Sequence, residues 1–246
     1  MTGKPMTDTD ELIVNIWRGR ETGGLVEYRV PARSNQTVLD VVTEVQRRHE
    51  PALAYRFACR VGVCGSCAMT VNGIPRWTCR THVKKVADEG KLTIEPLRNM
   101  PRIKDLACDM AEFFGKWQKA GGRFQGKRTR HEPPANVDPQ SRKRRAADAG
   151  IECINCAVCY SACDAVAGNP DYFGPAALNR TWTLVNDERH AAQGETLDKA
   201  NGDGGCGSCH TMGSCIKHCP IGIVPTAGIA GLKRMSLLSF LGRAPE

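Results

Sequence analysis

The chain has 246 residues, a formal net charge of +8 and 41% hydrophobic residues, enough apolar material for about two packed domains. No apolar run reaches the roughly 18 residues of a membrane span, and the start, MTGKPMTDTD, lacks the features of a signal peptide. We therefore expect neither a membrane-spanning nor a secreted chain. A cytoplasmic protein, or a soluble piece attached to something else, fits better.

The first half alternates strand and helix patterns. Residues 11–19 (ELIVNIWRG) and 25–32 (LVEYRVPA) are strand candidates on either side of a Gly-Gly turn. Residues 37–49 carry an apolar stripe that predicts a helix, built from Val38, Leu39, Val42 and Val45. Further strands are expected in residues 67–80, around a turn at Asn72-Gly73, and in 91–97. This order predicts a small α+β sheet packed on one helix, followed by an amphipathic helix over 103–120.

The second half, from about residue 146, contains few strand patterns. Residues 174–192 and 228–242 have helical patterns, and cysteine runs occupy the segments between helices. We expect this half to be all-α. The predicted domains are residues 10–120, a linker over 121–145, and residues 146–246.

Much of the positive charge lies between residues 116 and 145. Nucleic acid is one candidate partner, but no zinc-finger spacing or RNA-binding motif accompanies the charge. A solvated basic linker, or a surface facing an acidic partner or anionic lipid, is favoured. A zinc-stabilised, basic, nucleic-acid-binding protein remains the alternative from another functional class.

Thirteen cysteines stand in the chain, and all except Cys108 fall into three groups. In a reducing compartment, such numbers indicate metal binding or redox chemistry rather than disulfides. Cys108 lies in the apolar stripe of the helix predicted over 103–120, where a small buried hydrophobic residue is the simpler interpretation.

The first group is typical of a plant-type [2Fe–2S] site. Its spacing is C-x4-C-x2-C with a fourth cysteine twelve residues further on: Cys59, Cys64, Cys67 and Cys79. Gly62 and Gly65 allow the backbone to curl around two irons and to point amide N–H groups at sulfur. A four-thiolate zinc site is the alternative, but zinc prefers paired C-x2-C segments.

The second group has the C-x2-C-x2-C-x3-C spacing of bacterial ferredoxins, with Cys153, Cys156, Cys159 and Cys163. In two-cluster ferredoxins the fourth cysteine of each run binds the other cluster. That exchange predicts a [4Fe–4S] cluster on Cys153, Cys156, Cys159 and Cys219.

The same exchange leaves Cys163, Cys209 and Cys215 for a third cluster. Met212 occupies the position where a fourth cysteine would stand, and a thioether is a poor substitute for a thiolate on iron. Three cysteines favour [3Fe–4S]. The alternative is that Cys206 completes a fourth corner, since Gly204, Gly205 and Gly207 surround it.

Several clusters in one chain indicate electron transfer. No Ser-His-Asp arrangement, glycine-rich phosphate loop or pair of carboxylates stands out, so no catalytic residue is expected in this chain.

The segments FACRVGVCGSCAMTVNG, KDLACDM, NPDYFGPAAL and CPIGIVPT make the chain resemble the iron–sulfur subunits of succinate dehydrogenase and fumarate reductase, over roughly residues 10–240. The resemblance implies a β-grasp [2Fe–2S] ferredoxin domain followed by a helical bacterial-ferredoxin-like domain. It also implies a flavoprotein partner with covalent FAD, membrane anchor subunits and quinone. Such a subunit would lie at the cytoplasmic face of the inner membrane and pass electrons between FAD and quinone through the [2Fe–2S], [4Fe–4S] and [3Fe–4S] clusters.

The chain departs from the family pattern at two positions. Asp164 stands where proline commonly follows the fourth cysteine, and Gly168 stands where ubiquinone-reducing members carry tryptophan. His210 matches the family's histidine and is a candidate quinone contact. Ubiquinone and menaquinone therefore both stay open, as does the direction of turnover. A soluble, thiol-linked fumarate reductase is a second interpretation, although its extra cysteine-rich segments are not seen.

Overall fold

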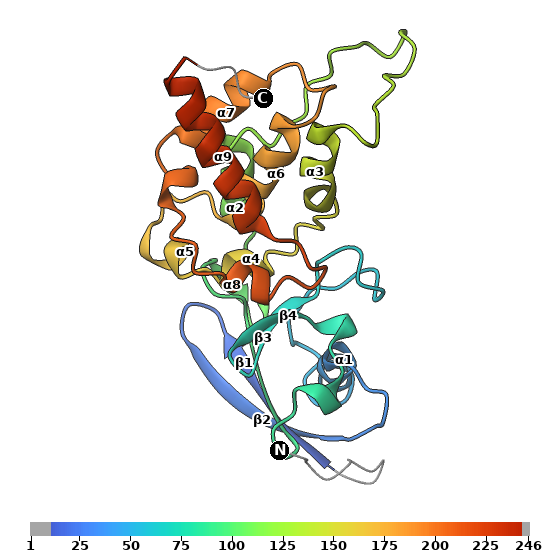
Figure 1. Ribbon diagram of the computed structural model, residues 1–246. Coiled ribbons are helices and arrows are strands. Elements are labelled where there is room, and N and C mark those ends of the chain that lie inside the picture. Colours follow the sequence, from blue (N-terminus) through green and yellow to red (C-terminus); the bar gives the residue numbers. More distant parts are fainter. Residues whose placement is uncertain (1–10, 243–246) are drawn as a thin grey trace. The chain divides into compact units, whose positions relative to one another are not determined.

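The computed structural model describes residues 11–242 and divides into two compact units (Figure 1). The first unit holds the described residues up to Met110 together with Ile154–Ser161. The second holds Ala111–Cys153 and the described residues from Ala162 onward. None of the described helices has the length and apolar character needed to cross a membrane.

The first unit is built on a five-stranded mixed sheet of order β2-β1-β5-β3-β4. Its strands are β1 Glu11–Gly19, β2 Gly23–Pro31, β3 Ala68–Val71, β4 Ile74–Trp77 and β5 Lys91–Glu95. β1 pairs antiparallel with β2 and parallel with β5, and β3 pairs antiparallel with both β4 and β5. Alternate residues of β1, namely Leu12, Val14 and Ile16, are fully buried, as the sequence pattern predicts.

One helix, α1 (Val38–Arg48), packs on this sheet and confirms the helix predicted over 37–49. Thr37 and Asp40 form a capping box that fixes its start. Val41, Val42 and Val45 on its apolar face join the core of the sheet. The predicted α+β sheet with a single packed helix is thereby confirmed, and two short 3-10 helices follow β4, at Thr78–Arg80 and Val83–Lys85.

The helix predicted over 103–120 is wrong in its first half. The chain forms β6 (Arg102–Lys104) and β7 (Ala107–Cys108), and α2 (Ala111–Lys119) begins only afterwards. Between the two short strands Asp105 has φ +50°, which no right-handed helix allows. Its carboxylate, with a side chain only 1% exposed, accepts hydrogen bonds from Gly19 N at 2.9 Å, Ala54 N at 2.9 Å and Arg18 Nε at 3.0 Å.

Cys108 consequently lies in β7 and not in a helix. It is buried, which fits the role of a small apolar residue. α4 (Val158–Ser161) also belongs to the first unit, where Ser161 Oγ accepts from Arg98 N at 2.8 Å and Asn99 Nδ2 donates to Tyr160 O at 3.0 Å.

The described part of the second unit is helical, as predicted. Besides α2 its helices are α3 Arg142–Ile151, α5 Asp164–Gly168, α6 Pro175–Val185, α7 Gln193–Asn201, α8 Ser214–Lys217 and α9 Pro225–Phe240, with a 3-10 turn at Cys206–Ser208. α6 is central and packs on α2, α3, α7 and α9. The helix predicted over 174–192 ends at Val185, while the one predicted over 228–242 begins three residues earlier, with Pro225 in its first turn.

Trp182 of α6 fills the seam between α6 and α9. A β-carbon on Gly231 would come 2.4 Å from the indole ring, and one on Gly228 would come 2.9 Å from it. The indole Nε1 donates to Ala146 O of α3 at 2.7 Å. Glycine at these two positions of α9 is therefore required by the close approach of a large ring.

Part of the basic segment is bound to this helical unit. Thr181 Oγ1 donates to Ala120 O at 2.6 Å, and Gln125 N donates to the buried His190 Nδ1 at 3.0 Å. Ala191 N returns a bond to Gln125 O at 2.8 Å. From residue 128 to the start of α3, by contrast, the chain forms no helix or strand and is largely exposed.

Candidate metal centres

The first cysteine loop curls around its own sulfurs. Val61 N and Val63 N each lie 3.4 Å from Cys59 Sγ, and Cys59 N lies 3.5 Å from Cys64 Sγ. Gly62 and Gly65 have φ of +79° and +70°, the left-handed region that the curl requires. The backbone therefore directs amide N–H groups at sulfur, as the spacing predicts.

The four thiols of this loop differ in environment. The amides of Val63 and Val61 lower the pKa of Cys59 to about 6. Burial, followed by the neighbouring Cys67, raises the pKa of Cys79 to about 12. Cys67 and Cys79 are buried beside Leu39, with Tyr55 and Trp77 packed against them. Two thiols that are at least partly open to solvent, Cys59 and Cys64, together with the buried pair make a four-cysteine donor set that fits a [2Fe–2S] cluster.

The boundary between the two units falls within the middle cysteine run. Cys156 and Cys159 belong to the first unit, whereas Cys153 and Cys163 belong to the second, as does the more distant Cys219. In the first unit, Asn155 and Ala157 have φ of +52° and +62°, so the backbone turns sharply on each side of Cys156. In the second unit, Ile223 N lies 3.3 Å from Cys219 Sγ, again an amide directed at sulfur.

The third group lies within the second unit, where Cys163, Cys209 and Cys215 line one hollow, called the third-site hollow below. Cys163 precedes α5, Cys209 follows the 3-10 turn, and Cys215 lies in α8. Burial, followed by the charges of the other two thiols, raises the pKa of Cys215 to about 11. Burial likewise raises the pKa of Cys163. Three thiols that line one hollow are the kind of donor that iron–sulfur clusters use, so the residues fit such a cluster.

Met212 and Cys206 differ in their relation to this third-site hollow. Met212 lines it and is 61% exposed. Cys206 is 4% exposed, is not among the lining residues, and has its Sγ 3.8 Å from Asn201 Oδ1. His210 lines the hollow too, beside Cys209, and also lines an open depression with Asp164 and Gly168.

Sequence reasoning missed Tyr172. It is fully buried, lines the same hollow, and its hydroxyl has no hydrogen-bond partner among the described residues outside the third site. The segment NPDYFGPAAL gave no hint of this, because a tyrosine in a turn is not distinctive by type or spacing.

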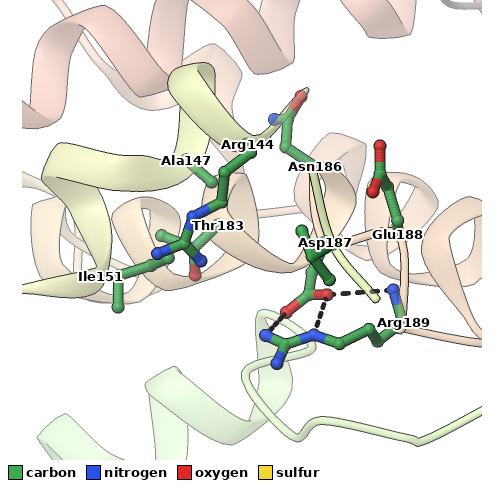
Figure 2. A pocket seen from close by; sticks show the side chains of 9 residues that line it. Arg144, Ala147, Ile151, Thr183, Asn186, Asp187, Glu188 and Arg189 are labelled. Carbon is green, nitrogen blue, oxygen red and sulfur yellow. Dashed lines mark hydrogen bonds and ion pairs between the residues drawn. The ribbon is translucent and has the colours of Figure 1, made fainter. Parts of the chain in front are cut away.

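A further cavity in the second unit, shown in Figure 2, contains no cysteine. It is lined by Val137, Arg144, Ala147, Ile151, Thr183, Asn186, Asp187, Glu188 and Arg189. Asp187 is already bound there by Arg189, through Nε at 2.8 Å and Nη2 at 2.7 Å. Across residues 11–242, no group of three or more His, Cys, Asp or Glu side chains is placed to hold a single metal ion.

The comparisons with known proteins agree with this arrangement. Residues 13–115 match the family model of a 2Fe-2S iron-sulfur cluster binding domain, and residues 152–224 match that of a 4Fe-4S dicluster domain. Fold and cysteine sites thus define an electron-transfer protein of the two-domain iron–sulfur class.

Similar sequences and a similar solved structure identify the particular family. The chain is 33% identical to the "Succinate dehydrogenase [ubiquinone] iron-sulfur subunit 1, mitochondrial" of Oryza sativa subsp. japonica, over 87% of this chain and 76% of the relative. It is 34% identical to a "Fumarate reductase iron-sulfur subunit" of Mycobacterium tuberculosis, over 84% and 83%. A chain of the "Mycobacterium smegmatis Sdh1 complex in the apo form" superposes with a TM-score of 0.81 at 26% identity, covering 93% of this chain and 96% of that one. The chain belongs to the family of iron–sulfur subunits of succinate dehydrogenase and fumarate reductase.

Proposed function

We propose that this subunit carries electrons between the FAD of a flavoprotein partner and a membrane quinone through three centres. The proposed ligands are Cys59, Cys64, Cys67 and Cys79 for [2Fe–2S]; Cys153, Cys156, Cys159 and Cys219 for [4Fe–4S]; and Cys163, Cys209 and Cys215 for [3Fe–4S]. The subunit would sit at the cytoplasmic face of the inner membrane, held by anchor subunits.

The observation that carries the proposal is the third-site hollow. Three thiols converge on it, and at the position where a fourth cysteine would complete a ferredoxin run the chain has the exposed thioether of Met212. Cys206 is buried and is not among the residues that line the hollow. A site with three thiolates and one open corner is suited to a three-iron centre.

When bound, the clusters supply one-electron redox chemistry. The residues of this chain hold them and shape their surroundings. Amide N–H groups of Val61 and Val63 stabilise charge on Cys59, and burial keeps Cys67 and Cys79 from water. The organic reaction takes place on the partner, so no catalytic residue is assigned here.

We place the quinone contact at His210. Its side chain lines the third-site hollow and also the open depression bordered by Asp164, Gly168 and Asn169. Because Gly168 has no side chain, this depression is wider than a tryptophan would leave it. A quinone bound there would be contacted by His210 and by few other polar side chains.

Metal analysis and EPR spectroscopy of the purified complex test the proposal. About 9 irons per chain with acid-labile sulfide support it, and zinc alone would overturn it. An odd-electron signal in the oxidised complex identifies the three-iron centre. Cys206→Ser should leave that signal unchanged. Loss of the centre in this variant would instead make Cys206 a ligand.

A further inference from the structure

Tyr172 is held firmly in the wall of the third-site hollow. Its backbone N donates to Asn169 O at 3.1 Å, and the next residue, Phe173, donates its N–H to Gly204 O at 2.8 Å. Gly204 packs so tightly on this turn that a β-carbon there would come 1.9 Å from Asp171 O. The turn therefore cannot move away from the cysteine-rich segment without breaking these contacts.

The hydroxyl of Tyr172 is buried and has no partner outside the third site. Apart from the sulfur of Cys209, itself a proposed ligand of the third centre, no described nitrogen, oxygen or sulfur is placed to bond it, although the side chain is fully buried. A buried hydroxyl in that condition costs free energy, and phenylalanine would fill the same volume without the cost. An orphaned donor beside three thiols indicates that its acceptor is the group those thiols hold.

The hydroxyl is protonated at physiological pH. A phenol ordinarily has a pKa of about 10, and burial, the largest cause, raises that of Tyr172. The group is thus a hydrogen-bond donor throughout the physiological pH range, which is what an electron-rich sulfur acceptor requires.

We propose that the Tyr172 hydroxyl donates a hydrogen bond to a sulfur of the third centre and thereby raises its reduction potential. The inference rests on the proposed three-centre function and adds a positioning residue to it. Reduction adds one negative charge to the centre, and a donor directed at sulfur stabilises the reduced state more than the oxidised state. No covalent bond changes, and no proton leaves the tyrosine.

The test is an EPR redox titration of the third centre in the intact complex, comparing wild type with Tyr172→Phe. We expect the reduction equilibrium of the variant to be about tenfold less favourable, a fall of about 59 mV in midpoint for a one-electron couple. The matched control is Tyr28→Phe, which removes a hydroxyl that accepts from Arg18 Nη1 at 3.0 Å in the first unit. An unchanged midpoint in Tyr172→Phe would overturn the inference.

A second measurement decides the matter if the variant does not assemble. Wild-type complex with ring-deuterated tyrosine should show deuteron hyperfine coupling to the third centre, and absence of coupling would overturn the inference. The experiments distinguish a failure of the proposed function from a failure of the role inferred for Tyr172. A missing third centre contradicts the proposed function, whereas a centre that is present but neither shifted nor coupled contradicts only the role of Tyr172.

Discussion

Gly65 and Cys156 are in direct backbone contact. A β-carbon built on Gly65 would lie 2.8 Å from both Cα and Cβ of Cys156 and 3.0 Å from Ile154 O. Gly65 stands between two proposed ligands of the first centre, and Cys156 is a proposed ligand of the second. The two cysteine segments thus meet with no side chain between them, which shortens the path for an electron passing from one to the other.

Gly65→Ala should therefore destabilise the first unit. The methyl group would meet rigid backbone, and alanine at φ +70° adds strain, so we expect a loss of about 2–4 kcal/mol in the free energy of unfolding. Gly73→Ala is the matched control, because Gly73 has φ +76° but nothing within 4 Å of its β-carbon position. The control should lose only about 1 kcal/mol in the free energy of unfolding, the cost of the backbone strain alone. Equal losses in denaturant titrations would refute the contact argument.

Asp105→Asn should weaken the first unit in a pH-dependent way. Burial alone would raise the pKa of Asp105, but hydrogen bonds from Ala54 and Gly19 and the charge of Arg18 lower it on balance. The depressed pKa gives stability that is present above the unfolded pKa of about 3.9 and is lost as the pH falls through the lower, folded-state pKa.

We expect Asp105→Asn to cost about 1–3 kcal/mol near neutral pH. The difference from wild type should shrink as the pH falls below about 4, because the unfolded state takes up the proton at a higher pH than the folded state does. Urea titrations at several pH values measure it. Asp88→Asn, at an exposed position of the same unit, should have little effect at any of them. A pH-independent difference would show that the charge of Asp105 is not what stabilises the turn.

Two glycines in helices of the second unit should respond to alanine with opposite signs. Gly231→Ala would place a methyl group 2.4 Å from the Trp182 ring, and we expect a loss of about 1–3 kcal/mol despite better helix propensity. Gly115→Ala in α2 meets nothing within 4 Å and should gain about 0.5–1 kcal/mol. Thermal denaturation of both variants decides it, and a stabilised Gly231→Ala would mean that α9 can shift away from the indole.

Met212→Cys should convert the third centre to a four-iron cluster. The side chain at 212 already lines the hollow, so a thiolate there can supply the missing ligand. We expect the oxidised-state EPR signal to vanish and a reduced-state [4Fe–4S] signal to appear, with one more iron per chain. Met212→Leu, which adds no ligand, should keep the original signal. Retention of that signal in Met212→Cys would place the open corner of the cluster elsewhere.

Sequence patterns were sufficient for the regular parts of the fold. The alternation of Leu12, Val14 and Ile16 and the apolar stripe of α1 predict elements that the structure contains, because their periodicity reflects burial directly. For residues 103–110 the same use of periodicity gave a wrong prediction. Its spacing suits a helix, but the conformation of Asp105 is decided by partners 51 and 86 residues away.

Some features of the candidate sites could likewise be predicted from the sequence, and others could not. Cysteine spacing groups Cys163 with Cys209 and Cys215, and the structure brings these three together. The orphaned hydroxyl of Tyr172 could not be found from sequence, because its significance lies in what surrounds it. The burial of Cys206 was equally hidden, since the glycines beside it indicate a flexible segment.

The partial anchoring of the basic segment has a consequence for proteolysis. Residues up to 127 are fastened by backbone hydrogen bonds, including Lys127 N to Arg189 O at 3.0 Å, whereas the stretch from Arg128 to the start of α3 is exposed and irregular. A protease must draw its substrate into an extended form, which only the second stretch can offer. Trypsin should therefore nick the native chain after Arg128 or Arg130 and spare Lys127, leaving two fragments that stay together because the helices on either side of the cut, α2 and α3, both pack on α6.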